Sequence, residues 1–216
     1  MAKHGIMIRF EQLTFQYTPK AELLTFPDWA VEQGEHALIL GSSGSGKTTL
    51  LHLLAGLLKP KSGRLIVGQE DLSTISGSAL DKYRGRNIGL VFQKPHLLNA
   101  LSLQQNLLLA QYMAGLKQDK NRVNEVIEAL SLDHRKHALV HTLSQGEAQR
   151  ASIARAVLNN PLVILADEPT SSLDDENCDK VLEILQKQAQ SYQATLVIAT
   201  HDQRIKDVVD KQYIMN

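Results

Sequence analysis

The chain has 216 residues, of which 43% are apolar, so it is long and hydrophobic enough to bury the core of a large domain rather than remain disordered. Lysine plus arginine and aspartate plus glutamate both number 23, and a net charge of zero excludes the basic surface that nucleic acid or an anionic membrane would favour. The single cysteine, Cys178, excludes an internal disulfide. No apolar run approaches the roughly 20 residues of a membrane span, and the N-terminus lacks a signal-peptide core, so we expect no direct membrane insertion.

The first half of the chain predicts mostly strands. Residues 6–17 alternate between apolar and polar and are rich in β-formers, which is typical of an antiparallel strand. The strand pattern at 23–31 is interrupted by Pro27, as at an edge strand or bulge. The elements predicted next are a strand at 37–40, a helix at 50–58, a strand at 64–67 and a strand at 87–92.

The second half begins with helices. Apolar residues repeat at helical spacing from Leu103 to Leu132 with a break at Gly115, and Ser144 is a candidate N-cap for a helix that ends at Leu158. The remaining predicted elements are a strand at 162–166, a helix at 175–190, a strand at 195–199 and a short helix at 203–209. The two strands are apolar throughout, which is typical of parallel strands buried on both faces.

A glycine-rich motif joins a predicted strand to a predicted helix. It has the spacing G-x-x-x-x-G-K-[ST] and consists of Gly41, Ser42, Ser43, Gly44, Ser45, Gly46, Lys47 and Thr48, followed by Thr49. In this context backbone N–H groups surround the phosphates of a nucleotide, the lysine reaches the β- and γ-phosphates, and the threonine hydroxyl ligates Mg²⁺. A flexible Gly/Ser linker is the alternative, but linkers do not usually separate a buried strand from an apolar helix.

Together these patterns predict an α/β fold: a P-loop NTPase core with a mostly parallel sheet, an N-terminal antiparallel β subdomain and an inserted helical subdomain. We expect a single domain over 1–216. Residues 6–92 and 160–216 would form the α/β core with its β subdomain, and residues from about 94 to 158 the helical subdomain.

Two acidic residues follow the apolar strand at 162–166. Ligands bind beyond the carboxyl ends of parallel strands, so Asp167 is placed to complete a Mg²⁺ site with Thr48. Glu168, one residue later, is placed to polarise a water for attack on the γ-phosphate. The alternative is that the two acids only cap the next helix.

The segment Leu143-Ser144-Gln145-Gly146-Glu147-Ala148-Gln149-Arg150 resembles the L-S-G-G-Q signature of the ATP-binding cassette (ABC) ATPases, and the resemblance extends over nearly the whole chain. It implies a head-to-tail homodimer in which Ser144 and Gly146 contact ATP held by the other copy. Gln145 stands where the family has glycine, and would be strained if that position needed a positive φ. The segment is also a capping box, Ser144 with Glu147, and both descriptions can hold together.

The resemblance assigns further site residues. Gln93 matches the glutamine that approaches Mg²⁺ and the attacking water, and His201 matches the switch histidine at the γ-phosphate. Ser172-Leu173-Asp174 matches the D-loop, so Asp174 is a candidate contact across the dimer; an ordinary N-cap is the alternative. Tyr17 matches the aromatic residue that stacks on adenine, although Phe15 lies on the same face and is the other candidate.

The expected function is therefore ATP hydrolysis with Mg²⁺, coupled through dimerisation to an integral membrane permease subunit, with the protein on the cytoplasmic face of the membrane. The apolar loop after Gln93, which includes Leu97 and Leu98, matches the place where the family docks its membrane subunit; the alternative is that these leucines pack under the helical insertion. The loop is similar to that of the branch that serves lipoprotein release and macrolide efflux. The alternative is an ABC ATPase that drives mechanical signalling to an extracytoplasmic enzyme.

Overall fold

The computed structural model describes residues 5–170, 175–202, 205–206 and 209–215. Its strands are β1 (Ile6–Phe15), β2 (Leu24–Phe26), β3 (Trp29–Glu32), β4 (His36–Gly41), β5 (Ser62–Val67), β6 (Glu70–Asp71), β7 (Ile88–Val91), β8 (Val163–Asp167), β9 (Thr195–Thr200) and β10 (Lys211–Met215). Its helices are α1 (Lys47–Leu54), α2 (Gly77–Asn87), α3 (Leu103–Met113), α4 (Lys120–Ala129), α5 (Gln145–Val157) and α6 (Asp175–Ser191), with short 3-10 turns η1 (Asp133–Arg135) and η2 (Val140–Thr142).

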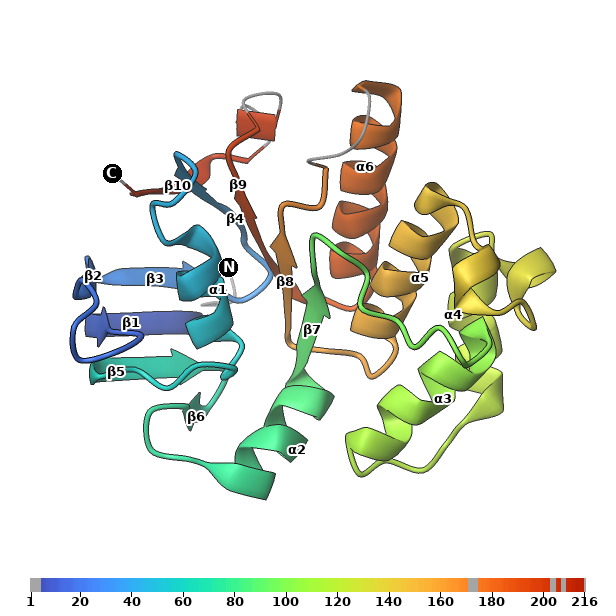
Figure 1. The fold of residues 1–216 in the computed structure, drawn as a ribbon, viewed down its shortest axis with the longest axis horizontal. Helices are drawn as coiled ribbons and strands as arrows, with labels where there is room; N and C mark the ends of the chain where they lie inside the picture. Colours follow the sequence, from blue (N-terminus) through green and yellow to red (C-terminus); the bar gives the residue numbers. More distant parts are fainter. Residues whose placement is uncertain (1–4, 171–174, 203–204, 207–208, 216) are drawn as a thin grey trace.

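A parallel sheet forms the centre of the molecule (Figure 1). Its strand order is β10-β4-β9-β8-β7, and each neighbouring pair is parallel. Every residue of β8 and β9 is buried, because both faces of these strands are covered. The carboxyl ends of β4, β7, β8 and β9 therefore meet at one edge of the sheet, which is where ligands bind in sheets of this kind.

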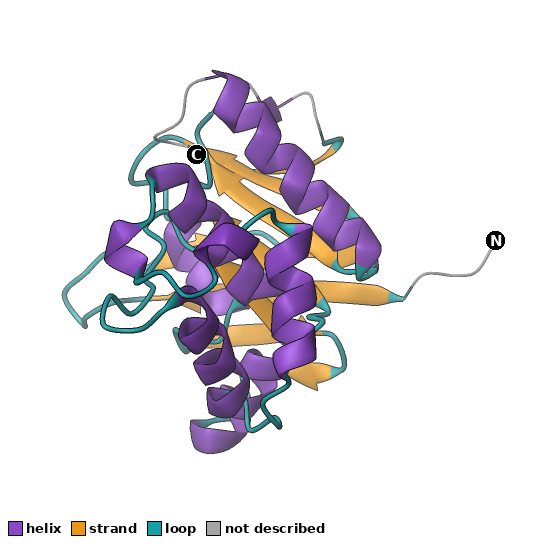
Figure 2. Cartoon of the chain, turned by 90° about the vertical axis from the view of Figure 1, so that its right-hand side faces the viewer, coloured by secondary structure: helices purple, strands orange, loops and turns teal. Residues whose placement is uncertain are grey.

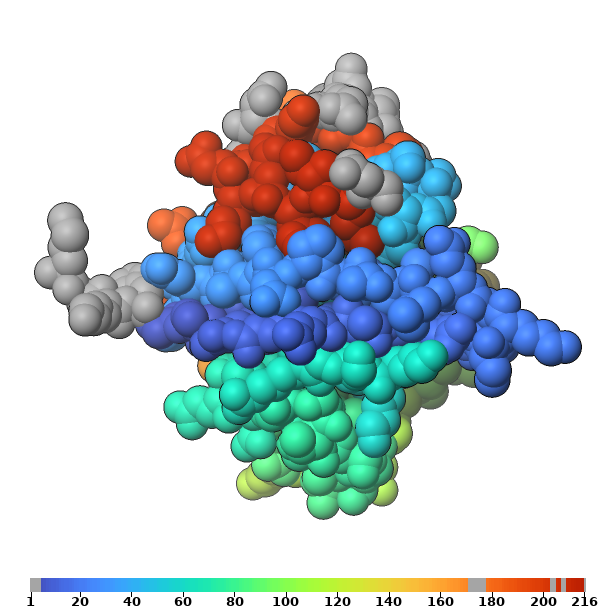
Figure 3. All heavy atoms as spheres, turned by 90° about the vertical axis from the view of Figure 1, so that its left-hand side faces the viewer, coloured from blue at the N-terminus to red at the C-terminus, as the bar shows by residue number. Residues whose placement is uncertain are grey.

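The second sheet is antiparallel and is organised around the long strand β1. One end of β1 pairs with β2 through Leu13 and Phe26, the other pairs with β3 through Phe10 and Trp29, and β5 runs along its other side. Pro27 lies between β2 and β3, so the predicted interrupted strand is two short strands on successive parts of β1. Figure 3 looks onto the outer face of this sheet, with β1 and β3 across the middle and β5 below.

Helix α1 lies between the two sheets. Its leucines Leu50, Leu51, Leu53 and Leu54 are fully buried in a core shared by the antiparallel sheet and one face of the parallel sheet. A second core covers the other face, where α3, α4, α5 and α6 pack. Figure 2 shows these helices in front of the strands. The parallel sheet thus separates α1 from α5, a point on which the site below depends.

The predicted fold class is confirmed, and the elements that the sequence analysis missed include helix α2 and strand β10. Helix α2 has no buried residue, so it carries no apolar periodicity to detect. Strand β10 is a sheet edge in which only Tyr213 is buried, and it pairs with β4 far back in the chain. The predicted break at Gly115 is present, with φ +65°, between α3 and α4. The short helix expected at 203–209 falls largely outside the described residues.

Candidate active site

The glycine-rich motif forms the turn between β4 and α1. Gly44 has φ 85°, and Gly46, the residue before α1, has φ 95° and ψ 10°. Both values lie in the left-handed region, where a residue with a Cβ would be strained, so the glycines make this tight turn possible. The Ser45 hydroxyl is buried in the turn without a hydrogen-bond partner. A buried polar atom of this kind fits a loop whose remaining partner is a bound ligand.

The ammonium group of Lys47 is held over the same loop. Nζ donates to the carbonyl oxygens of Gly41 at 2.9 Å and Ser42 at 3.0 Å, and it lies 3.6 Å from Oε1 of Glu168. Lys47 is only 6% exposed, so this charge sits in a water-poor position where an anion interacts strongly. The lysine is therefore placed to neutralise phosphate oxygens that enter the loop.

Thr48 and Asp167 bring two oxygen ligands together. Thr48 Oγ1 donates to Asp167 Oδ1 at 3.2 Å, joining the start of α1 to the end of β8. Burial raises the pKa of the Asp167 carboxyl above its ordinary value, and the Thr48 hydrogen bond offsets part of this rise. A buried carboxylate beside a hydroxyl fits Mg²⁺, which prefers oxygen ligands. Within the described residues no group of three His, Cys, Asp or Glu side chains could hold a metal, so phosphate and water oxygens would complete the shell.

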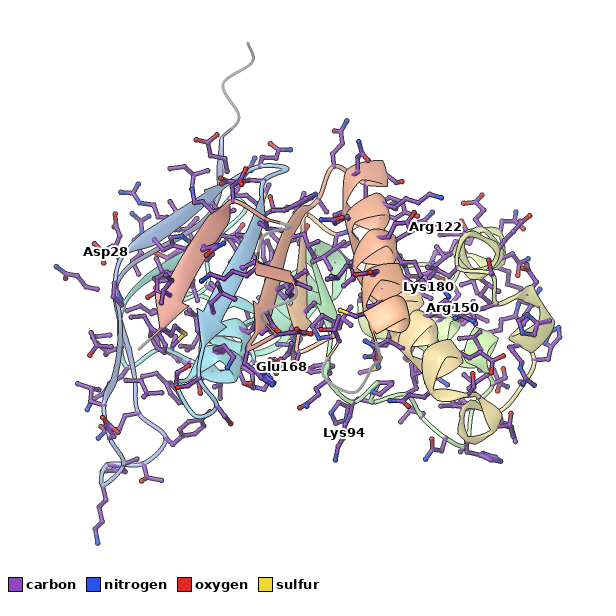
Figure 4. All side chains as sticks on the ribbon, turned by 90° about the horizontal axis from the view of Figure 1, so that it is seen from above. Asp28, Lys94, Arg122, Arg150, Glu168 and Lys180 are labelled. Atoms are coloured by element: carbon purple, nitrogen blue, oxygen red, sulfur yellow. The ribbon has the colours of Figure 1, made fainter. Side chains whose placement is uncertain are left out.

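Glu168 is fixed by the neighbouring strand β9. Its carboxylate accepts from Thr200 Oγ1 at 3.1 Å and contacts His201 Nδ1 at 2.7 Å, and its backbone N–H donates to Ala199 O at 2.8 Å. Its φ of 46° is unusual for a residue other than glycine. Seen from above, at the carboxyl ends of the strands, Glu168 lies beside α1 (Figure 4). The structure thus brings together Lys47, Asp167, Glu168 and His201 from three parts of the chain.

Of the remaining residues predicted for this edge of the sheet, the structure describes Gln93 but not the predicted D-loop. Gln93 follows β7, whose Val91 pairs with Ala166 of β8, so it lies at the same end of the sheet as Asp167. Ser172, Leu173 and Asp174 lie outside the described residues.

Tyr17 and Phe15 differ in the way that distinguishes a stacking residue from a core residue. Tyr17 is 60% exposed, and its hydroxyl is 2.8 Å from Thr49 Oγ1 at the first turn of α1. Phe15 is 7% exposed and packs into the core, with its ring edge-on to Tyr17 at 4.7 Å between centroids. Of the two, Tyr17 is the one whose ring is exposed beside the loop, as a stacking residue must be.

The predicted signature segment begins α5 and is held by a complete capping box. Ser144 Oγ accepts from the backbone N–H of Glu147 at 3.3 Å, and Glu147 Oε2 accepts from the backbone N–H of Ser144 at 2.8 Å. Gln145 is the first residue of the helix, so the positive φ that would strain it is not adopted. Gly146 follows, and the segment lines a hollow of about 790 Å³ between α5 and α6. In Figure 4, Arg150 and Lys180, which also line the hollow, lie along these two helices.

Sequence reasoning missed several residues that hold this site. Thr200 holds Glu168, and Arg135 and His134 hold the buried carboxylate of Glu147. None of the three belongs to a recognisable motif, and Arg135 and His134 lie in the short turn η1. Only the folded chain identifies them.

Comparisons with known proteins place these features in context. Residues 24–171 match the family model described as ABC transporter. The chain is 36% identical to the lipoprotein-releasing system ATP-binding protein LolD of Cytophaga hutchinsonii over 190 residues, 87% of each chain. It is 40% identical to an ABC transporter ATP-binding protein of Thermotoga maritima over 87% of this chain and 81% of that one. Among solved structures, the dimeric post-hydrolysis state of the ATP-binding cassette MJ0796 with ADP and Pi matches with a TM-score of 0.86 and 28% identity, over 97% of this chain and 94% of that one.

Proposed function

The chain belongs to the ABC transporter family as an ATP-binding subunit that hydrolyses ATP, and we propose that two copies dimerise around ATP to drive a separate membrane subunit. The observation that supports this proposal most directly is the position of the two ATP-facing segments. The phosphate loop begins α1 on one face of the parallel sheet, and Ser144 begins α5 on the other face. A nucleotide on the loop is therefore reached by the Ser144 turn of a second copy.

Binding would use the residues of the loop and its surroundings. The backbone of Gly41 to Lys47 surrounds the phosphates, the Lys47 ammonium neutralises them, and the Tyr17 ring stacks on the base. Gly46 offers a left-handed turn that ends against the first N–H groups of α1, which attract anions. Thr49 supports the ring of Tyr17 through its hydroxyl.

Thr48 and Asp167, with Gln93 from the end of β7, would hold Mg²⁺. When bound, the ion would neutralise charge on the phosphate oxygens. The residues fit this task because Asp167 is 6% exposed and its charge has few internal partners. A cation from outside offsets the cost of burying that charge.

Hydrolysis would depend on Glu168 as the residue that directs water at the γ-phosphate. Its carboxylate is already oriented by Thr200 and His201, so little rearrangement is needed before it accepts a proton. The His201 side chain is 58% exposed, which leaves its ring accessible to a phosphate on the loop. Lys47, which lies near Glu168 in this structure, would turn to the phosphates when ATP binds.

The surface after β7 is the part that we assign to the membrane subunit. Asn106, 5% exposed, braces this loop by accepting from Leu98 N at 2.8 Å and donating to Leu98 O at 3.1 Å. Leu98 itself is 51% exposed, whereas Leu97 packs partly against the helical core. Lys94 projects outward from the same loop (Figure 4). An apolar side chain held outward on a braced loop suits a partner surface.

No helix among the described residues is long and apolar enough to cross a bilayer, and we propose that the membrane subunit supplies the spans. We propose a peripheral position on the cytoplasmic face and, because the relatives at about 35% identity are named for lipoprotein release, a lipid-anchored cargo. ATPase activity of the reconstituted complex should rise with a lipoprotein substrate. Activity that instead follows an extracytoplasmic enzyme would favour mechanical signalling.

Dimerisation is tested with a hydrolysis-blocked protein. The Glu168→Gln variant, saturated with Mg-ATP, should elute as a dimer by size-exclusion chromatography with light scattering. Adding Ser144→Arg should return it to a monomer that still binds ATP. A dimer that persists in the protein carrying both substitutions would remove the role of the Ser144 turn.

Docking is tested on native membranes. Leu98→Asp should reduce co-purification of the membrane subunit with the tagged protein, and Leu57→Asp, which changes a leucine of 41% exposure after α1, should not. Equal recovery with both variants would contradict the assignment of this loop.

A further inference from the structure

The carboxylate of Glu147 is buried at the start of α5, away from the residues around the phosphate loop. Glu147 is 7% exposed, and one of its oxygens, Oε2, closes the capping box with Ser144 N at 2.8 Å. That role needs an acceptor but no charge, since an amide oxygen accepts the same hydrogen bond. A negative charge in this position costs free energy unless a cation compensates it.

The compensating cation comes from outside the helix. Arg135 Nε donates to Glu147 Oε1 at 2.8 Å, and His134 Nε2 lies 3.1 Å from the same oxygen. Arg135 ends the short turn η1, whose backbone is held by the bond from Arg135 N to Leu132 O at 2.9 Å. The guanidinium is the largest cause of the fall in the Glu147 pKa to about 2. The carboxylate is therefore charged at physiological pH, and Arg135 is the main group that stabilises this charge.

These contacts continue to the hydroxyl of Ser144. Glu147 ties the Ser144 backbone through Oε2, and the Glu147 N–H occupies one lone pair of Ser144 Oγ at 3.3 Å. Among the described residues the hydroxyl hydrogen of Ser144 has no acceptor in this geometry, so it is left to donate outward. Because both its backbone and its oxygen are held, the Ser144 side chain is preorganised, and its hydroxyl hydrogen can turn to an acceptor outside the chain.

We propose that Arg135 is a positioning residue for the ATP-driven dimer: through the Glu147 carboxylate, its guanidinium holds the Ser144 turn in the conformation that donates to the nucleotide of a second copy. This inference rests on the proposed function, because it assigns Arg135 to the trans contact. Arg135 touches no nucleotide itself. Arg135 affects the Ser144 turn only through the negative charge of Glu147.

The dependence on Glu147 separates this role from ordinary support of the fold. Removing the guanidinium leaves the buried charge with only His134 and the Ser144 N–H as partners, and the carboxylate then takes up water and loosens its hold on the turn. With glutamine at position 147 there is no charge to compensate. The loss of Arg135 should then have little effect on the dimer.

The test is a double-mutant cycle in the full-length Glu168→Gln protein with Mg-ATP. Arg135→Gln should weaken dimerisation by about 3- to 10-fold in the Glu147 background, and this effect should vanish when Glu147→Gln is also present. ATP binding to the monomer should not change, which also shows that each variant is folded. Arg135→Lys should restore part of the dimer affinity. The matched control is Arg64→Gln, which removes an exposed arginine paired with Asp71 at 2.8 Å in the antiparallel sheet.

The inference would be overturned if Arg135→Gln weakened the dimer equally in both backgrounds, or in neither. The proposed function would still stand in that case, provided that the parent Glu168→Gln protein forms a dimer with Mg-ATP. A parent protein that fails to dimerise with Mg-ATP would overturn both.

Discussion

Two carboxylates with little exposed surface, Asp167 and Glu147, have pKa values that are shifted in opposite directions. Asp167 is 6% exposed and Glu147 7%, but burial raises the pKa of Asp167 whereas Arg135 and the Ser144 N–H lower that of Glu147 to about 2. Two differences account for this: Asp167 ends a strand that is buried throughout, so burial dominates its shift, and the two carboxylates have different hydrogen-bond partners. Asp167 accepts one hydroxyl hydrogen bond, from Thr48, while Glu147 accepts from an arginine, a histidine and a backbone N–H.

The comparison shows how one fold prepares two kinds of site. At the end of β8 the Asp167 carboxylate has one hydrogen-bond donor, Thr48, among the described residues, and a bound cation would stabilise a buried charge of this kind. At the start of α5 the charge is satisfied within the chain and serves to fix a turn. We propose that the first region binds a ligand and that the second serves as a contact surface for a second copy. The predictions below test this difference, beginning with the largest effect.

The largest effect is expected on ATP turnover, from a substitution next to Asp167 at the end of β8. Glu168→Gln should reduce ATP turnover by about 100-fold or more, because a general base typically contributes about 10²- to 10⁴-fold. ATP binding should be retained. The measurement is phosphate release at saturating Mg-ATP, with Glu128→Gln on the exposed face of α4 as the control. Substantial activity in the Glu168→Gln protein would mean that another group directs the water.

A smaller loss is expected when the exposed ring next to the loop is removed. Tyr17→Ala should weaken ATP binding by about tenfold, since stacking on a base contributes about 1–3 kcal/mol. Tyr17→Phe keeps the ring and should stay close to the parent protein. Phe15→Leu should lower stability rather than affinity, because Phe15 is a core residue. Titration with a fluorescent nucleotide gives the affinities, and weak binding only in the Phe15→Leu protein would reverse the assignment.

The two carboxylates should respond in opposite ways to neutralisation. Without nucleotide, Asp167→Asn should raise Tm by a few degrees, because it removes a buried charge and keeps an acceptor for Thr48. Glu147→Ala should lower Tm by a few degrees, because it removes half of the capping box, and about 1 kcal/mol corresponds to about 2–4 °C in a chain of this size. The measurement is the Tm of both variants by calorimetry. Tm shifts of the same sign would contradict the proposed difference between the two carboxylates.

The smallest effect concerns acid stability. The pKa of Glu147 lies below its unfolded value, so its contribution to stability is present above about pH 4.5 and is lost as pH falls toward about 2. The Asp167 pKa is raised, so protonation of that group favours the folded state as pH falls. Urea unfolding at about pH 5 and about pH 3 should show a smaller drop in the free energy of unfolding for Glu147→Gln than for the parent protein. Equal drops would show that Glu147 does not carry this dependence.

Some elements could not be predicted from local sequence patterns. Helix α2 has no fully buried residue, although Leu80 and Tyr83 pack partly against the core, and β10 is an edge strand with Tyr213 as its buried residue, so neither shows a strong apolar periodicity. Phe15 and Tyr17 share a face of the same segment, and no local pattern tells which is buried. Packing against α1 and the antiparallel sheet makes that choice.

Contiguous residues were enough to predict the glycine turn before Lys47, the acids that end a buried strand, and the capping box at Ser144. Each of these depends on backbone conformation and spacing within a few residues. The contacts that distant groups make with them appear only in the folded chain, although the family resemblance already assigns His201 to the site. His201 meets Glu168 across 33 residues and Arg135 meets Glu147 across 12, because strand order and helix packing, not local propensity, bring those side chains within hydrogen-bond distance.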